Sequence, residues 1–392
     1  MKTVRCILQK GKERPVKNRH PWIFSGAIDR IDEGFEAGDL VRVLSDQEEF
    51  LGIGYLNPES QIVVRMLAFE DVAIDEAFFD ERISRALQMR KRFIPPATNA
   101  YRLIHSEGDF LSGLTVDVYG DFLVAEFNTA GIDVWKPVIV ECLQKYFPVH
   151  SIFERSDSDL RKWEGLKRSV GVLAGKEPPD AIEIEENGLL FGVDIQGGQK
   201  TGFFLDQREN REIVRGLSAG KRVLNCFAYT GGFSVYAAKG GAKEIVSVES
   251  SEPAVAMGRK NFERNRLSSE QSVWAQQDVF DYLRATKKEF DLIILDPPAF
   301  CKSKNQVQHA ARGYKDINLQ AFKQLPKGGL LFTFSCSSYI TPDLFQKVIF
   351  GAASDAKRNV RILKKTSHAF DHPINIYHPE GEYLKGLLCE VF

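Results

Sequence analysis

The carboxyl-terminal half of the chain alternates buried-type strand patterns with helical patterns, and this alternation restricts the fold more than any other feature. Five apolar runs lead into helical stretches at about 232–239, 253–265, 279–287, 311–325 and 341–354; the runs are residues 222–227, 244–249, 273–278, 290–296 and 329–335. Such alternation forms a parallel sheet covered on both faces, with the ligand site at the carboxyl ends of the strands. Two later runs, 360–363 and 384–392, would complete a seven-stranded sheet.

The amino-terminal half has a different pattern of predicted strands and helices. Short strand-like runs at 40–44, 50–55 and 62–67 are separated by turn residues, which predicts a small β-barrel. A helix over 76–93 ends before Pro95 and Pro96, and strands then alternate with one helix up to about residue 172. A polar, proline-doubled segment at 175–180 marks a second break. We therefore predict three domains: a barrel over 1–70, a central α+β domain over 71–187, and an α/β domain over 188–392.

Composition excludes several classes of protein. Of the 392 residues, 43% are hydrophobic and 27% are charged, as in ordinary globular proteins. No apolar stretch approaches the ~18 residues that span a bilayer, and no signal-peptide pattern follows the basic start, so we expect a cytoplasmic protein. The six cysteines lie far apart without a CxxC pair, which argues against zinc and thioredoxin-type sites and predicts free thiols. We expect no metal.

Positive charge is concentrated near the start of the chain. The 52 Lys and Arg residues nearly balance the 53 Asp and Glu residues overall. Residues 2–19, however, hold seven basic side chains against the single acid Glu13: Lys2, Arg5, Lys10, Lys12, Arg14, Lys17 and Arg19. This basic strip could meet the phosphates of a nucleic acid, or it could be a solvated face.

A loop rich in small residues follows the first strand of the α/β domain. It runs from Asn225 to Phe233 and opens a helix, so a ligand could approach its backbone at the positive helix end. The dinucleotide fingerprint GxGxxG fails, because Tyr229 stands where a glycine would be needed. The second strand ends at Glu249, which could bind ribose hydroxyls, and the third ends at Asp278, which could bind an adenine amino group.

The fourth and fifth strands end in residues that could perform chemistry. The fourth runs into Asp296, whose carboxylate is held at the sheet edge by Pro297 and Pro298. The fifth ends just before Cys336. A thiolate is a natural nucleophile for carbon 6 of a pyrimidine, and this addition activates carbon 5 to take a methyl group from a sulfonium. Asp296 could hydrogen-bond or protonate nitrogen 3 as charge develops on the ring.

Several motifs, in this order and spacing, resemble the bacterial ribosomal RNA large subunit methyltransferase I family, which makes 5-methylcytosine. They run almost from end to end of the chain: residues 20–26 (HPWIFSG), 202–211 (GFFLDQRENR), the 225–233 loop, 296–298 (DPP), 312–318 (RGYKDIN), 334–337 (FSCS) and 383–386 (YLKG). The carboxyl-terminal half is similar to class I, Rossmann-like methyltransferases, and the start is similar to an RNA-binding PUA domain.

The resemblance implies a cofactor, a substrate and roles for particular residues. S-adenosylmethionine is the implied cofactor, large-subunit ribosomal RNA the implied partner, and the family's nucleophile corresponds to Cys336 with Asp296 as its partner. The implied cofactor-binding residues are Gln207, Arg211, Phe227, Tyr229, Gly231, Glu249, Asp278 and Asp296. No membrane partner is implied, and the sequence leaves open whether the chain forms a homodimer.

The sequence also leaves alternatives to this interpretation. Many RNA cytosine-5 methyltransferases carry a second cysteine directly after the two prolines, where this chain has Ala299. We predict that Cys301, two residues further on, is not the base that removes the carbon 5 proton, and that water or another group does so. The rival functions are methylation of a purine nitrogen, a non-catalytic ribosome-assembly protein, and a nicotinamide dehydrogenase, which Tyr229 disfavours.

Overall fold

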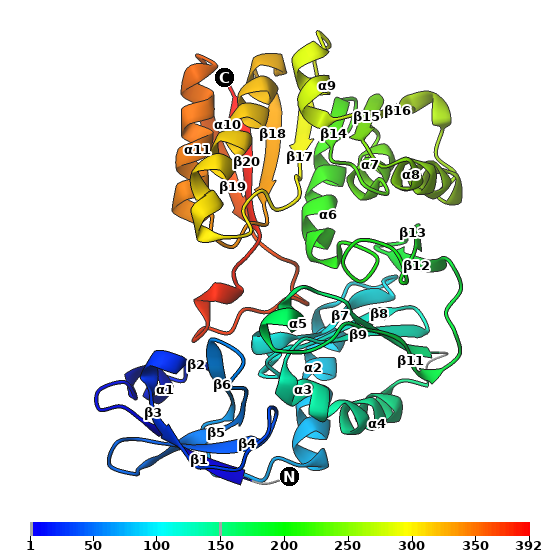
Figure 1. Ribbon diagram of the computed structural model, residues 1–392. Coiled ribbons are helices and arrows are strands. Elements are labelled where there is room, and N and C mark those ends of the chain that lie inside the picture. Colours follow the sequence, from blue (N-terminus) through cyan, green and yellow to red (C-terminus); the bar gives the residue numbers. More distant parts are fainter. Residues whose placement is uncertain (1–2, 149–150) are drawn as a thin grey trace. The chain divides into compact units, whose positions relative to one another are not determined.

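The computed structural model describes residues 3–148 and 151–392, which form two compact units (Figure 1). Unit 1 comprises Met1–Ile184, Val193–Leu205 and Phe370–Gly381. Unit 2 comprises Glu185–Gly192, Asp206–Ala369 and Glu382–Phe392. Two short segments of unit 1 thus come from the sequence that we assign to the third domain, and our domain boundaries stay predictions. Among the described residues, no helix is both long and apolar enough to cross a membrane.

The first part of unit 1 is a six-stranded sheet with the strand order β2-β6-β5-β4-β1-β3. The strands are β1 (Thr3–Leu8), β2 (Trp22–Phe24), β3 (Ile28–Ile31), β4 (Leu40–Leu44), β5 (Phe50–Leu56) and β6 (Ile62–Ala68), with the short helix α1 (Arg14–Lys17) between β1 and β2. Valines of β4 and β6 are fully buried in its core, among them Val41, Val43 and Val64. The sequence predicted β4 to β6 but not β1 to β3.

The second part of unit 1 is a five-stranded sheet, ordered β11-β10-β9-β8-β7, with helices packed against it. Its elements are α2 (Glu76–Phe93), β7 (Ala100–His105), β8 (Leu114–Tyr119), β9 (Phe122–Phe127), α3 (Ala130–Val134), α4 (Lys136–Tyr146), β10 (Ser151–Ser156), α5 (Leu160–Trp163) and β11 (Ser169–Gly175). Asp75 caps α2 by accepting the N–H of Phe78 at 3.1 Å, so this helix begins where the sequence predicts.

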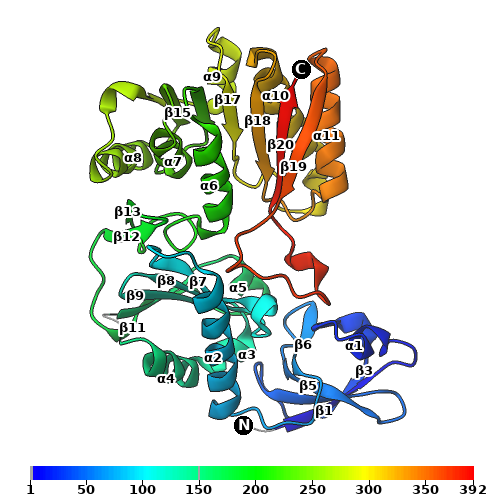
Figure 2. The same cartoon turned by 180° about the vertical axis from the view of Figure 1, so that it is seen from behind.

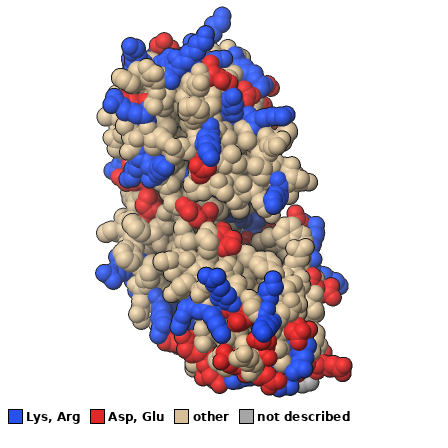
Figure 3. All heavy atoms as spheres, turned by 90° about the vertical axis from the view of Figure 1, so that its left-hand side faces the viewer, with Lys and Arg blue, Asp and Glu red and all other residues tan. Residues whose placement is uncertain are grey.

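The basic strip lies on β1, α1 and their connections, and several of its side chains are paired. Nε of Arg5 lies 3.1 Å from Asp32, Nζ of Lys17 lies 3.3 Å from Glu49, and Nη2 of Arg19 lies 3.0 Å from Glu70. Lys2 lies outside the described residues. Figure 3 shows Lys and Arg interspersed with Asp and Glu over the face in view. Carboxylates therefore oppose part of the positive charge of the strip, at Arg5, Lys17 and Arg19.

Unit 2 is built on a seven-stranded sheet ordered β16-β15-β14-β17-β18-β20-β19. The strands are β14 (Arg222–Cys226), β15 (Glu244–Glu249), β16 (Ser272–Gln276), β17 (Leu292–Leu295), β18 (Leu330–Ser335), β19 (Val360–Thr366) and β20 (Lys385–Val391). The first five run parallel, and β20 is antiparallel to both of its neighbours. A two-stranded sheet of β12 (Ile182–Glu186) and β13 (Leu189–Val193) precedes this sheet in the chain.

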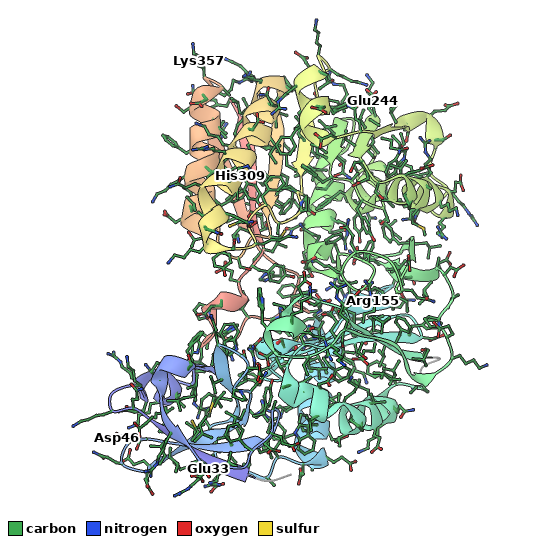
Figure 4. All side chains as sticks on the ribbon, in the orientation of Figure 1. Glu33, Asp46, Arg155, Glu244, His309 and Lys357 are labelled. Carbon is green, nitrogen blue, oxygen red and sulfur yellow. The ribbon has the colours of Figure 1, made fainter. Side chains whose placement is uncertain are left out.

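Helices cover both faces of the seven-stranded sheet (Figures 1 and 2). One group consists of α6 (Arg208–Leu217), α7 (Gly232–Lys239) and α8 (Glu252–Arg264), and the other of α9 (Val279–Ala285), α10 (Val307–Gln324) and α11 (Pro342–Asp355). The carboxyl ends of the parallel strands meet at one edge. Glu244, which begins β15, and Lys357, which precedes β19, lie at the other end of their strands and are labelled in Figure 4.

Candidate active site

The loop between β14 and α7 turns sharply at the carboxyl edge of the sheet. Phe227, Tyr229 and Gly231 have positive φ angles of 59°, 47° and 80°. A Cβ added to Gly231 would lie 2.9 Å from Cη2 of Trp274, so this position needs glycine for its backbone and for the space. The loop therefore presents its backbone next to the N-terminus of α7, where a ligand can approach it closely.

Glu249 ends β15 and binds two backbone N–H groups with its carboxylate. Oε2 accepts from the N–H of Tyr229 at 2.9 Å, and Oε1 accepts from the N–H of Ser251 at 2.9 Å. The carboxylate thus fixes the β14–α7 loop relative to the end of β15. A carboxylate has about four acceptor positions, so Glu249 retains capacity for ligand hydroxyls.

Asp278 caps the N-terminus of the helix that follows it, α9. The third strand, predicted over 273–278, ends at Gln276 in the structure. Asp278 is exposed and caps α9, because its Oδ1 accepts the N–H groups of Phe280 at 2.8 Å and Asp281 at 3.2 Å. Aspartate is a preferred residue at this position of a helix. Its contact with adenine stays a prediction.

Gln207 and Arg211 lie at the start of α6, and both are buried. Nε and Nη2 of Arg211 donate to the two carboxylate oxygens of Glu186, at 2.8 and 2.7 Å. Oε1 of Gln207 accepts from Nδ2 of Asn210 at 2.6 Å. The guanidinium group of Arg211 is thus engaged by a carboxylate, and the contact of either residue with a cofactor stays a prediction.

Asp296 and Cys336 follow neighbouring strands at the same edge of the sheet. In the parallel pair β17 and β18, Leu295 lies opposite Thr333, so both strands reach the edge together. Sγ of Cys336 lies 3.7 Å from the carbonyl oxygen of Pro297, the residue after Asp296. Both side chains are half-buried. The structure therefore brings together the two loops that carry these residues.

Ser337, which sequence reasoning did not single out, fixes the loop that carries Cys336. Its side chain is fully buried. Oγ of Ser337 lies 2.9 Å from the hydroxyl of Tyr314 on α10 and accepts the backbone N–H of Cys301 at 3.2 Å. The carbonyl oxygen of Ser337 accepts from Nζ of Lys385 at 2.8 Å. Helix α10, the loop after β17 and strand β20 are distant in sequence, and each of them forms a hydrogen bond with Ser337.

Lys385 is a second residue that the sequence reasoning gave no role. It begins β20 opposite Ser335 of β18, is 5% exposed, and also donates to the carbonyl oxygen of Tyr383 at 2.7 Å. Burial lowers the pKa of Lys385 to about 8. The signal in the sequence is a lysine at the first position of a strand that is mostly apolar, with Glu390 as its other charged residue.

Aromatic rings surround the loop after β17. The ring of Phe300 lies 6.3 Å from that of Phe227, 5.9 Å from that of Phe280 and 4.7 Å from that of Tyr314, measured between centroids. These rings come from the carboxyl ends of β14 and β17 and from α9 and α10. They form an apolar wall beside the polar groups, as is typical of small-molecule sites.

Comparison with known proteins identifies the family. A family model described as an S-adenosylmethionine-dependent methyltransferase matches residues 167–365, and a PUA-like domain model matches residues 6–69. A protein of Cronobacter sakazakii named Ribosomal RNA large subunit methyltransferase I is 43% identical over 99% of this chain and 100% of its own length. A protein of the same name from Tolumonas auensis is 46% identical over 97% of this chain and 98% of its own length.

The chain belongs to the ribosomal RNA large subunit methyltransferase I family. A solved structure of a candidate methyltransferase complexed with SAH has a TM-score of 0.86 at 28% identity and covers 100% of both chains. A candidate SAM-dependent methyltransferase from Streptococcus mutans has a TM-score of 0.85 at 28% identity, over 99% of this chain and 100% of its own. The predicted methyltransferase fold with an amino-terminal PUA-like domain is confirmed, and so is S-adenosylmethionine as the cofactor.

The residues at the carboxyl edge fit this cofactor. Oγ1 of Thr230, in the loop between β14 and α7, is buried and has no hydrogen-bond partner among the described residues. A buried polar atom of this kind is expected where a ligand completes the hydrogen bonding. Within the described part of the chain, no group of three or more His, Cys, Asp or Glu side chains could hold a metal ion.

Proposed function

We propose that this protein methylates carbon 5 of a cytosine in large-subunit ribosomal RNA, with Cys336 as a covalent nucleophile. The names of its full-length relatives support a ribosomal RNA substrate. The observation that carries the chemistry is the position of the Cys336 thiol, with Sγ 3.7 Å from the carbonyl oxygen of Pro297 beside Asp296. A purine nitrogen needs no covalent activation, so a thiol at this position favours a pyrimidine carbon.

The proposed reaction begins with the sulfur. The thiolate of Cys336 forms a bond to carbon 6, and the electrons of the ring double bond move toward carbon 5 and nitrogen 3. Asp296 gives a proton to nitrogen 3, which stabilises the charge that develops there. Carbon 5 then bonds to the methyl group of a sulfonium donor, whose sulfur would keep the electrons of the broken S–CH3 bond and leave as a neutral thioether. Loss of the carbon 5 proton to water re-forms the double bond, expels the thiolate, and returns the nitrogen 3 proton to Asp296.

S-adenosylmethionine supplies an electrophilic methyl group when it is bound. We propose that the backbone of Phe227, Tyr229 and Gly231 lies against its methionine part and that Glu249 binds its ribose hydroxyls. Asp278, Gln207, Arg211 and Asp296 complete the proposed set of cofactor-binding residues. This assignment places the donor next to the strand end that carries Asp296, because β14 and β17 are neighbours in the sheet.

The RNA has to present its target base out of the stack, since a base inside a helix cannot reach a thiol. We propose that the PUA-like barrel contacts the RNA outside the target nucleotide.

We also propose a cytoplasmic enzyme, as expected for a protein that acts on bacterial ribosomal RNA. Gel filtration of the purified protein tests whether it forms a homodimer.

We propose that Cys301 does not remove the carbon 5 proton. The Cys301 side chain is 3% exposed, and Sγ lies 3.2 Å from the carbonyl oxygen of Ser303, to which it donates. A buried thiol engaged with its own loop is poorly placed to meet a substrate carbon. Accordingly, Cys301→Ser should release product without accumulating an enzyme–RNA adduct on denaturing gels. Accumulation of that adduct would assign the role to Cys301.

The proposal is tested by methylating ribosomal RNA in vitro and digesting it to nucleosides for mass spectrometry. The wild-type protein should yield 5-methylcytidine, and Cys336→Ala should lower the rate at least ~10³-fold while it binds S-adenosylmethionine with unchanged affinity. A methylated purine that persists in Cys336→Ala would establish nitrogen methylation instead. Ribosome binding without any methylation would support an assembly protein.

A further inference from the structure

The burial of the Lys385 ammonium group is not explained by the fold alone. Its ammonium group is nearly fully buried, and its two hydrogen bonds go to neutral carbonyl oxygens, of Ser337 and Tyr383. Within the part of the chain that the structure describes, it forms no ion pair with a carboxylate. A buried cation costs several kcal/mol unless an anion accompanies it. The charged form of Lys385 is therefore favoured only where a neighbouring group can become negative.

The thiol of Cys336 is the group that can supply this charge. Lys385 lies opposite Ser335 in the β18–β20 register, and its side chain reaches past the strand end to the carbonyl of Ser337. Cys336 is the residue between these two points, and a negative charge on its sulfur would raise the pKa of Lys385. An ammonium group has three N–H donors, of which the two carbonyls take two. The third is then available to a sulfur atom.

We propose that Lys385 is a positioning residue that pairs with the thiolate of Cys336, both before the sulfur attacks the base and after it leaves. The Cys336 thiol loses its proton to solvent, and the thiolate forms an ion pair with the Lys385 ammonium group. When carbon 6 releases the sulfur, the same ammonium group receives the returning negative charge. This inference rests on Cys336 as the nucleophile of the proposed function, although the pairing itself needs no RNA.

Other titratable groups also face this pair, and the experiment has to account for them. They come from the loop after β17, from α10, and from the segment before β20: Asp296, Cys301, Tyr314, His368, Glu382 and Tyr383. Burial raises the pKa of Tyr314 above its ordinary value. Substitutions confined to residue 385 leave all of these groups in place.

The decisive measurement is the rate at which iodoacetamide alkylates Cys336, without RNA, between pH 6 and pH 10. The five other cysteines are buried, and mass spectrometry of the Cys336 peptide excludes their contribution. Lys385→Gln keeps N–H donors for the two carbonyls but removes the charge. It should react roughly tenfold more slowly than wild type at pH 7 and should approach the wild-type rate at high pH, because an adjacent cation favours a thiolate by about one pKa unit or more.

Matched variants separate charge from structure. Lys385→Arg keeps the positive charge and should retain fast alkylation at pH 7. Lys357→Gln removes an exposed lysine at the opposite end of the same sheet and should match wild type throughout (Figure 4). Lys385→Met is a second neutral variant in case Lys385→Gln is unstable. Calorimetry with S-adenosylmethionine verifies that each variant is folded.

A wild-type pH profile in either folded neutral variant would overturn the pairing. The methylation assay distinguishes this outcome from failure of the proposed function. If the product is a methylated purine, the proposed function fails whatever the alkylation profile shows. If 5-methylcytidine forms and alkylation at pH 7 is unaffected by the loss of the lysine charge, only the pairing fails.

Discussion

The two halves of the carboxyl edge in unit 2 are built in different ways. On the donor side, at the ends of β14 and β15, the site consists of backbone, with three positive φ angles in one loop and a Glu249 carboxylate bound to two N–H groups. On the acceptor side, at the ends of β17, β18 and β20, it consists of side chains arranged around the buried Ser337.

This difference matches what the proposed reaction requires of each side. A cofactor that stays the same from one turnover to the next can be bound by fixed backbone atoms and one carboxylate. A nucleophile that gains and loses a bond needs side chains that adjust its charge and hold its loop in place. Changes on the donor side should therefore affect cofactor affinity, and changes on the acceptor side should affect the rate of methyl transfer.

The largest effect within this comparison is expected at Gly231 on the donor side. Gly231→Val would force a β-branched residue to φ +80°, with its Cβ 2.9 Å from Trp274. Strain of 1–3 kcal/mol or more predicts S-adenosylmethionine affinity lower by about 10- to 100-fold in calorimetry. Gly220→Val is the control, since φ is +70° there and nothing lies within 4 Å of the added Cβ. Equal losses in both variants would show that the effect is general backbone strain.

A smaller effect is expected at Glu249. Glu249→Gln leaves one acceptor oxygen and removes the charge that binds the N–H groups of Tyr229 and Ser251. S-adenosylmethionine affinity should fall roughly tenfold, while alkylation of Cys336 stays within about twofold of wild type. Glu244→Gln, at the other end of the same strand, should bind the cofactor normally. If Glu249→Gln slowed the alkylation of Cys336 as well as lowering S-adenosylmethionine affinity, the donor side and the acceptor side would not act independently.

The smallest effect is expected at Ser337 on the acceptor side. Ser337→Ala removes the hydroxyl that contacts Tyr314 and the N–H of Cys301, which leaves a buried donor unpaired. The free energy of unfolding should fall by about 1–2 kcal/mol and kcat by a few-fold, with cofactor affinity unchanged. The exposed neighbour gives the control Ser338→Ala, which should change neither quantity. Weaker cofactor binding in Ser337→Ala would contradict the division between the two sides.

The donor side could be predicted from the sequence because its signals are local. A strand, a glycine-containing loop and a helix follow one another between residues 222 and 239, and β15 has the bounds that its apolar pattern predicts. The prediction was less accurate at β16, which ends at Gln276 because Asp278 is committed to capping α9. Local patterns show that an acidic residue is present, but they do not show which backbone N–H groups will donate hydrogen bonds to it.

The acceptor side could be predicted only in part. Asp296 and Cys336 were identifiable because each directly follows an apolar strand. Ser337 and Lys385 lie in two of the motifs that carry the family resemblance, but their roles could not be predicted, since these depend on a contact between residues 48 positions apart in the chain. The same limit applies to Val193–Leu205 and Phe370–Gly381, which pack with unit 1 although the sequence around them belongs to unit 2.

The most direct test of the account uses RNA that carries 5-fluorocytosine at the target position. Fluorine cannot leave carbon 5 as a proton does, so a cytosine held through carbon 6 stays attached to the enzyme after methyl transfer. The account predicts a stable enzyme–RNA complex that requires S-adenosylmethionine, maps to the peptide containing Cys336, and is absent in Cys336→Ala. Methylation of unmodified RNA by an enzyme that never forms this complex, or a complex at another residue, would contradict it.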